Sequence, residues 1–426
     1  MKKYTLLILI LSFTFTMAQN TFDYSSEWKK IEKLETNGLN KSLLPLVQTI
    51  YQQAKKDQNS EQLIRALFYQ SKILQSTSDN EDIEVEIIRN FENEIQHAKG
   101  TDKSFLESIL AELYANYYES NSWTIMRRTE TEEKTTDDFR FWTRKSFQQN
   151  INELYLNSIK DDKSLKSESI ENWKYLLHEV PETQEFRPTL YDFLAYRVID
   201  YFQSETNSYT RSTFDSEYEE FKKNTITQIF TDLISFHSSK NQTSATAYNE
   251  LKFLQFKKSD MPDDEFEKKL IQLSEKYSTN SFTPYILMEL AMYYQNKSNG
   301  MAEKDFAKRK ENLEKSIHYL DQIITKTPKT DMSNQAENMK KQIHAPDFGI
   351  QIEKYVSPNL NVPIVISHKN LNTLYFKVLR FNDSKQNVLN DYRYAKENEK
   401  QKQLNAILSS LPLETEFAID VKNFDD

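Results

Sequence analysis

Apolar residues recur at helical spacing over most of this chain, from about Phe22 to His344. Side chains three and four residues apart fall on one face of an α-helix, where they can pack against another helix. The first such series runs through Leu39, Leu43, Leu46, Val47, Ile50 and Tyr51. Only 4 of the 426 residues are glycine, and helical backbone rarely needs the positive φ values that glycine permits. The pattern therefore predicts a mainly α-helical protein.

Later segments repeat this design with polar breaks between them. A second apolar series at 63–74 follows a break at 57–60, and we expect further helices at 83–95, 105–117, 141–159 and 190–202. Breaks are expected at Lys99-Gly100 and at Asn121-Ser122. The charged stretch from Arg127 to Arg140 is typical of a solvated loop or a frayed helix end.

The stretch from Ser281 to Pro328 partly matches a tetratricopeptide repeat, a pair of antiparallel helices. Its first half has Leu290, Ala291 and Tyr294 at the spacing of the first helix, and its second half has Ser316, Leu320, Ile323 and Pro328 at the spacing of the second. An extra loop is expected at 299–310. The sequence thus favours paired antiparallel helices over a regular repeat array.

Near Pro346 the apolar period changes from helical to alternating, which is typical of β-strands. Strands are expected around Ile350, Ile352 and Tyr355, at 362–367, at 373–381 and from Phe417, with a polar helical insertion at 387–408. This divides the chain into an α-helical scaffold at 19–345 and a β-domain at 346–426. Four strands are fewer than the seven or so of a closed β-sandwich. The sheet is therefore expected to be incomplete, with an edge that recruits another chain.

Residues 1–18 have the pattern of a secretory signal peptide. Lys2 and Lys3 precede an apolar run from Leu6 to Phe15, and small residues at Thr16 and Ala18 suit a signal peptidase. Cleavage between Ala18 and Gln19 is expected, because the apolar run is short for a permanent membrane anchor. The sequence predicts a periplasmic or secreted protein of the cell envelope with no stable membrane span.

No motif for catalysis, for a cofactor or for a metal is recognisable in the chain. The absence of cysteine excludes thiol catalysis, zinc–thiolate sites and disulfides. The six histidines are His97, His178, His237, His318, His344 and His368. None lies three or four residues from another, so none forms a local helical metal pair, although distant ligands can converge in a fold. We expect each at the surface or capping a helix, and we predict no catalytic, cofactor or metal residue.

Two other features bear on ligands and partners. Tyr114, Tyr117, Tyr118, Trp123, Phe141 and Trp142 form an aromatic group that either lines a ligand groove or packs between helices. Packing is favoured, because large rings bury the most area. The net charge of −9 comes from interspersed acids and bases. Without a contiguous basic patch, nucleic acid is not an expected partner.

Several stretches resemble a known family. They are GLNKSLLPLVQTIYQQAKKDQNSEQLIRALFYQ (38–70), LYANYYESNSWTIMRRTETEE (113–133), DDFRFWTRKSF (137–147), FRPTLYDFLAYRVIDYF (186–202) and IEKYVSPNLNVPIVISHKNLNTLYFKVLRF (352–381). The first four are similar to the N-terminal helical region of large alpha-2-macroglobulin-like proteins of Bacteroidetes-type bacteria. The last is similar to the entry into their first macroglobulin-type β-sandwich.

The resemblance implies an exported protein whose family traps or inhibits proteases after a bait segment is cut, in some members with a Cys–Gln thioester. This chain has no cysteine and no bait segment, so none of the family's functional residues is carried over. A fragment, a frameshifted remnant and one half of a split protein remain open. The expected partners are proteins, either a protease target or the remainder of a split macroglobulin.

Two other classes of function compete with this one. A stand-alone helical-repeat module would bind a peptide or protein on a concave surface. An enzyme is the third class, and no residue in the sequence argues for it.

Overall fold

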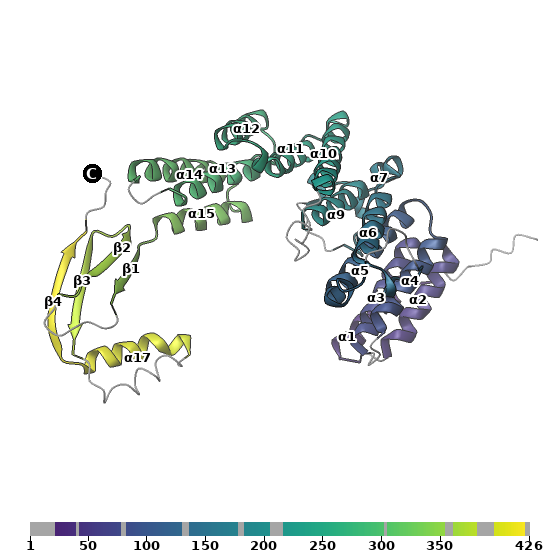
Figure 1. Cartoon of the computed structure of the whole chain (residues 1–426), viewed down its shortest axis with the longest axis horizontal. Coiled ribbons are helices and arrows are strands. Elements are labelled where there is room, and N and C mark those ends of the chain that lie inside the picture. The colour runs from purple at the N-terminus through teal and green to yellow at the C-terminus, as the bar shows by residue number, and fades with distance from the viewer. Residues whose placement is uncertain are drawn as a thin grey trace, which may run out of the picture. The chain divides into compact units, whose positions relative to one another are not determined.

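The computed structural model describes residues 22–39, 42–77, 82–129, 136–177, 183–204, 216–301, 305–353, 361–380 and 396–421. Over these residues the protein is mainly α-helical, with two small antiparallel β-sheets (Figure 1). The mainly helical class is therefore confirmed. The predicted signal peptide, with Ala18 and Gln19, and His178 lie outside the described residues.

Contacts divide the chain into two compact units, Met1–Phe253 and Leu254–Asp426. This division falls inside a helix, whereas the predicted division at 345/346 follows the change from helix to strand and stays a prediction. The first unit holds α1 (Tyr24–Thr36), α2 (Leu43–Asp57), α3 (Ser60–Thr77), α4 (Ile83–His97), α5 (Gly100–Ile125), α6 (Arg144–Ser158), α7 (Asp162–Ser167), α8 (Thr183–Phe186), α9 (Leu190–Ser204), α10 (Ser216–Ser239) and most of α11 (Thr243–Phe256).

The first three helices pack on the apolar faces that the sequence predicts. Their buried core consists of Trp28, Ile31, Leu43, Val47, Ile50, Ala66 and Ile73. Leu39 is an exception, because it is 50% exposed and precedes α2. Its N–H bonds the carbonyl of Leu34 while Gly38 adopts a φ of +71°, an arrangement that ends α1 in a left-handed turn.

Of the two breaks predicted around the helix α5, one is confirmed and the other is wrong. A left-handed Gly100, with a φ of +56°, begins it after α4 ends at His97, as expected at Lys99-Gly100. The break expected at Asn121-Ser122 is wrong, since α5 continues to Ile125. Ile125 is buried, and the Asn121 amide bonds the Tyr117 carbonyl one turn back. Polar residues alone do not end a helix whose next turn has an apolar anchor.

The segment predicted as a solvated loop at 127–140 is partly buried. Phe139 opens a short 3-10 turn, Phe139–Phe141, and its ring is 1% exposed. Asp138 caps this turn by accepting from the Arg140 N–H at 3.1 Å. The charged residues of the stretch therefore flank a buried aromatic ring.

The second unit begins with four helices, α12 (Asp263–Lys276), α13 (Thr283–Asn299), α14 (Phe306–Lys326) and α15 (Asp331–His344). The helices α13 and α14 run antiparallel. The Ser316 hydroxyl donates to the Ala291 carbonyl at 2.8 Å, and the Ser298 hydroxyl donates to the Arg309 carbonyl at 3.1 Å. The loop expected at 299–310 is shorter than predicted, because α14 begins at Phe306.

The strands form two separate two-stranded antiparallel sheets. One ribbon pairs β1 (Asp347–Ile352) with β2 (Ile364–Lys369), and the other pairs β3 (Thr373–Leu379) with β4 (Leu413–Asp420), with α17 (Glu397–Ser410) preceding β4. The four predicted strands are thus present, but not as one sheet in the described residues. The expected strand residue Tyr355 lies outside those residues.

Candidate functional site

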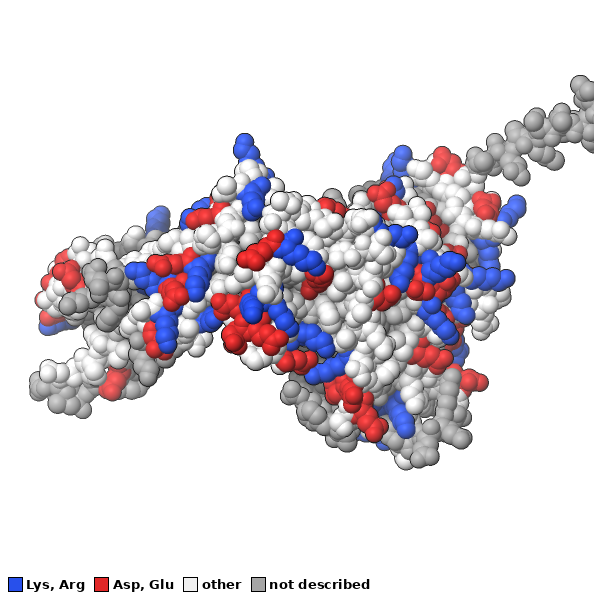
Figure 2. Space-filling model, turned by 90° about the horizontal axis from the view of Figure 1, so that it is seen from above, with Lys and Arg blue, Asp and Glu red and all other residues white. Residues whose placement is uncertain are grey.

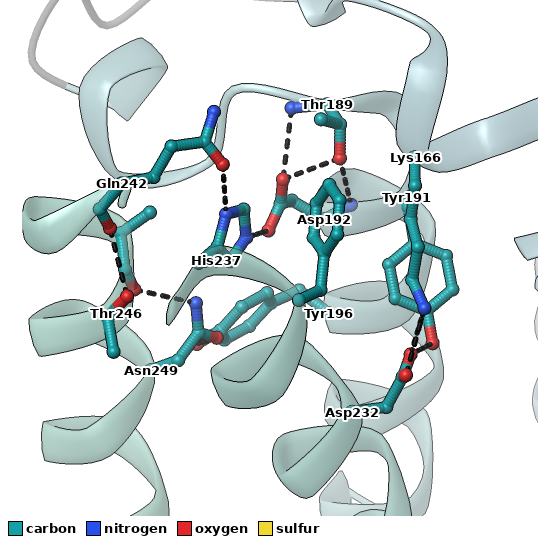
Figure 3. Close-up of polar contacts among 12 residues, drawn as sticks. Lys166, Thr189, Tyr191, Asp192, Tyr196, Asp232, His237, Gln242, Thr246 and Asn249 are labelled. Atoms are coloured by element: carbon teal, nitrogen blue, oxygen red, sulfur yellow. Dashed lines mark hydrogen bonds and ion pairs between the residues drawn. The ribbon is translucent and has the colours of Figure 1, made fainter. Parts of the chain in front are cut away.

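The prediction that every histidine lies at the surface or caps a helix is wrong for His237. Its side chain is fully buried in α10, where Nε2 lies 2.7 Å from Oδ1 of Asp192 and Nδ1 lies 2.7 Å from Oε1 of Gln242 (Figure 3). Asp192 is also fully buried. The two residues are 45 positions apart, so no local spacing in the sequence indicates the pair.

Asp192 is positioned by the start of α9. Its Oδ2 accepts from the Thr189 N–H at 2.9 Å and from the Thr189 hydroxyl at 2.6 Å, and its own N–H donates to that hydroxyl at 3.2 Å (Figure 3). This reciprocal pairing is a capping box, which satisfies N–H groups that the first turn leaves unpaired. A Thr-x-x-Asp sequence before an apolar run is the signal that could have placed Asp192.

Three further hydrogen bonds lie beside the His237–Asp192 pair, and together they form a polar network across neighbouring helices. The Tyr196 hydroxyl donates to Oδ1 of Asn249 at 3.0 Å, which joins α9 to α11. Asp232 on α10 accepts from the Tyr191 hydroxyl at 2.5 Å and from Nζ of Lys166 on α7 at 2.8 Å. Figure 3 shows these groups converging between the helices. The network therefore fixes how α7, α9, α10 and α11 pack.

The burial of the His237–Asp192 pair argues for a structural role. A catalytic histidine needs access to substrate, but neither His237 nor Asp192 has exposed surface. Burial lowers the pKa of His237. The hydrogen bond and negative charge of Asp192 and the hydrogen bond to Gln242 together raise that pKa by more, so the net shift is upward. The imidazole is held as the partner of a buried carboxylate, which would otherwise be left unpaired.

The aromatic group divides between core and surface. Tyr114 and Trp142 are buried, with ring centroids 5.1 Å apart, and Tyr117 and Tyr118 pack on Phe147. Helix packing is therefore the correct interpretation for these four rings. Trp123 and Phe141 depart from it, since they are 68% and 64% exposed. The Arg127 guanidinium lies 4.5 Å from the Trp123 ring centre. This contact covers part of the exposed Trp123 ring.

A groove of about 490 Å³ lies between α2, α3 and α4. The Gln70 amide donates to Oε1 of Gln48 at 2.6 Å, and the rings of Phe68 and Phe91 are 5.7 Å apart. The groove is lined by side chains from all three helices, which include Leu44, Gln48 and Tyr51 on α2, Leu67, Gln70 and Leu74 on α3, and Glu86, Asn90 and Glu94 on α4.

One end of the groove is bridged by side chains. The Tyr51 hydroxyl donates to Oε1 of Glu94, and Nζ of Lys55 lies 3.1 Å from the same oxygen. This contact joins α2 to α4. Burial, followed by the hydrogen bond to Glu94, raises the pKa of Tyr51, so this hydroxyl stays protonated and continues to donate.

The remaining polar groups of the groove are available to a ligand. Within the described part of the chain, the Asn90 and Asn93 amides have no hydrogen-bond partner and the Glu86 carboxylate has no ion-pair partner. The Gln48–Gln70 pair uses one donor and one acceptor, which leaves the Gln48 amide N–H groups and the Gln70 carbonyl. The groove thus offers amide donors and acceptors between apolar side chains.

The β-ribbons form a second candidate surface. Pairing places Phe348, Ile350 and Ile352 on the same face as Ile364 and Ile366. On the other ribbon, Leu374, Phe376 and Val378 share a face with Phe417 and Ile419. Most of these side chains are 41–58% exposed. Apolar ribbon faces that remain open to this extent are typical of interaction sites.

On the face seen in Figure 2, acidic and basic side chains are interspersed. In the part of the chain that the structure describes, no group of three or more His, Cys, Asp or Glu side chains is arranged to hold a metal ion. Among the same residues, no helix has the length and hydropathy needed to cross a bilayer. No family model, curated protein or solved structure matches this chain.

Proposed function

We propose that this chain is an exported, non-enzymatic protein of the cell envelope that docks other proteins. The observation that carries the proposal is the pair of ribbons with open apolar faces after a long array of helices. Burying such faces against a partner removes apolar surface from water, which is the main source of free energy in protein association.

The ribbons belong, in this proposal, to a macroglobulin-type β-sandwich that a further polypeptide segment completes. The similarity of residues 352–381 to the entry of that domain supports this assignment, as does the alternation of apolar side chains along the strands. The role at family level is protease inhibition. This chain would contribute a scaffold to it, since it lacks the cysteine that a thioester requires.

Export follows from the charged and apolar pattern of residues 1–18. Mass spectrometry of the chain recovered from cell envelopes tests it, with the mature protein expected to begin at Gln19. Recovery of the chain with Met1 intact from the cytoplasm would contradict export.

Photo-cross-linking in producing cells tests the docking role. A benzoylphenylalanine at Phe417, which is 42% exposed on the apolar face of the β3–β4 ribbon, is expected to cross-link to a protein with macroglobulin-type β-domains or to a protease. The matched control replaces Tyr175, which is 57% exposed in the helical unit. If Phe417 gives no more protein adducts than Tyr175, the docking role of the ribbons is wrong.

A stand-alone helical-repeat module is the second candidate, and the groove between α2, α3 and α4 favours it. In that case no partner protein binds the ribbons, and the helices form the binding surface. The cross-linking experiment separates the two candidates, because only the first predicts adducts at Phe417.

A further inference from the structure

We propose that the groove between α2, α3 and α4 binds an extended peptide segment that carries a lysine or arginine side chain. The inference rests on the proposal that this protein docks other proteins, and it names the chemistry of one partner. It uses a surface other than the ribbons.

The size and polarity of the groove suit a peptide in extended conformation. Its volume of about 490 Å³ lies within the range of about 300–1,000 Å³ that is usual for ligand pockets. An extended peptide presents N–H and C=O groups along both edges. The amides of Asn90 and Asn93, which have no partner among the described residues, and the unused groups of Gln48 and Gln70 supply both donors and acceptors for that backbone.

The charge of the groove selects a basic segment. Its only charged lining residues in the described chain are Glu86 and Glu94. Glu94 is already engaged by Tyr51 and Lys55 at the bridged end. Glu86 is exposed and has no ion-pair partner among the residues that the structure describes. A cationic side chain of the peptide therefore has its partner at Glu86, and complementary charge favours such a ligand over an acidic one.

The apolar lining residues indicate where a second side chain of the peptide, close to its basic residue, binds. Leu44 and Leu74 are half-buried and line the same groove as Glu86. Side chains that alternate along an extended peptide point to opposite sides, so residues two apart can meet the same wall. The expected ligand thus has an apolar residue close to its basic residue.

Selection from a library of random dodecapeptides on phage provides the probe. The chain from Gln19 is immobilised, and phage that bind the Glu86→Lys, Asn90→Ala double variant are removed beforehand. Both sites are exposed, so folding should be retained, and circular dichroism checks it. The selected peptides are expected to be enriched in Lys or Arg two residues away from Leu, Ile or Phe. Failure to select any peptide, or enrichment of acidic ones, would overturn the inference.

A synthetic copy of the most enriched peptide is then measured by fluorescence anisotropy. Glu86→Gln is expected to raise Kd about two- to fivefold, as for an exposed ion pair, and Asn90→Ala about three- to tenfold, as for a lost hydrogen bond. Glu119→Gln is the matched control, because Glu119 is exposed on α5 and lies outside the groove. Equal Kd values for Glu86→Gln, Asn90→Ala and the control would count against the groove.

Charge reversal completes the test. A peptide with its basic residue changed to Glu is expected to bind Glu86→Lys more tightly than it binds the wild-type chain, and the opposite result would refute the assigned contact. Ile350→Lys on β1 is expected to leave peptide binding unchanged. A failure of cross-linking at Phe417 therefore does not affect this assay, and the two proposals can fail separately.

Discussion

His237 makes the stability of the first unit depend on pH. Its pKa is raised in the folded state: burial lowers it, but Asp192 and Gln242 raise it by more, and Lys166 opposes them. The folded protein therefore holds this proton more tightly than the unfolded chain. The stabilisation is complete below the unfolded-state pKa of about 6.5 and is lost as pH rises through the folded-state pKa.

Urea denaturation at a series of pH values measures this effect. We expect the difference in unfolding free energy between wild type and His237→Gln to be greatest below about pH 6.5 and to shrink above it. His97→Gln is the control, because His97 is exposed at the end of α4. A difference that stays constant or grows with rising pH would show that His237 is not linked to Asp192 in this way.

The contact between α13 and α14 depends on a small residue at its centre. Ser316 is fully buried, and its hydroxyl reaches the Ala291 backbone. We expect Ser316→Leu to destabilise the second unit by about 1–3 kcal/mol, because added volume in a packed contact forces the helices apart. Ser316→Ala should cost less. Thermal unfolding provides the measurement, and Glu314→Leu on the exposed side of α14 is the control for added bulk. If Glu314→Leu lowered the stability as much as Ser316→Leu, close packing at Ser316 would be contradicted.

The open faces of the ribbons should make the chain associate. Ile350 on β1 is 47% exposed, and the neighbouring Gln351 lies on the opposite face. We expect the average mass of the wild-type chain in sedimentation experiments to rise with concentration, because unpaired strand edges and apolar faces recruit other chains. Ile350→Lys should reduce this rise and Gln351→Lys should not. Equal behaviour of the two variants would exclude the apolar face as the cause.

Each compact unit has its own buried core, so the whole molecule should unfold in two steps. His237→Ala should lower the first unit's transition, since an unpaired buried carboxylate costs about 3–5 kcal/mol. Ser316→Leu should lower the other transition. Calorimetry of the two variants and their combination provides the measurement. If either substitution moved both transitions equally, the units would form one cooperative structure.

The sequence predicted the parts of this fold that depend on local spacing. Apolar periods located α4 and α9 closely, and the alternation after Pro346 located the strands. The break at Asn121-Ser122 was wrong because Ile125, one turn further on, is anchored by tertiary packing. The mainly helical class with antiparallel strands was therefore predictable, while the separation into two ribbons depends on pairings between distant residues.

The candidate sites were less predictable for the same physical reason. The His237–Asp192 contact and the groove join side chains from different helices. Spacing along one helix tells which residues share a face but not which helix that face meets. Only the Thr-x-x-Asp start of α9 left a local trace in the sequence.

The mutual burial of Asp192 and His237 also has a consequence for inheritance. A mutation that replaces only Asp192 or only His237 leaves the other polar group buried without its partner, and this destabilises the protein. A substitution at one of the two positions is therefore tolerated only together with a substitution at the other. Descendants should retain the couple intact or exchange both for a pair of apolar residues with matching volume.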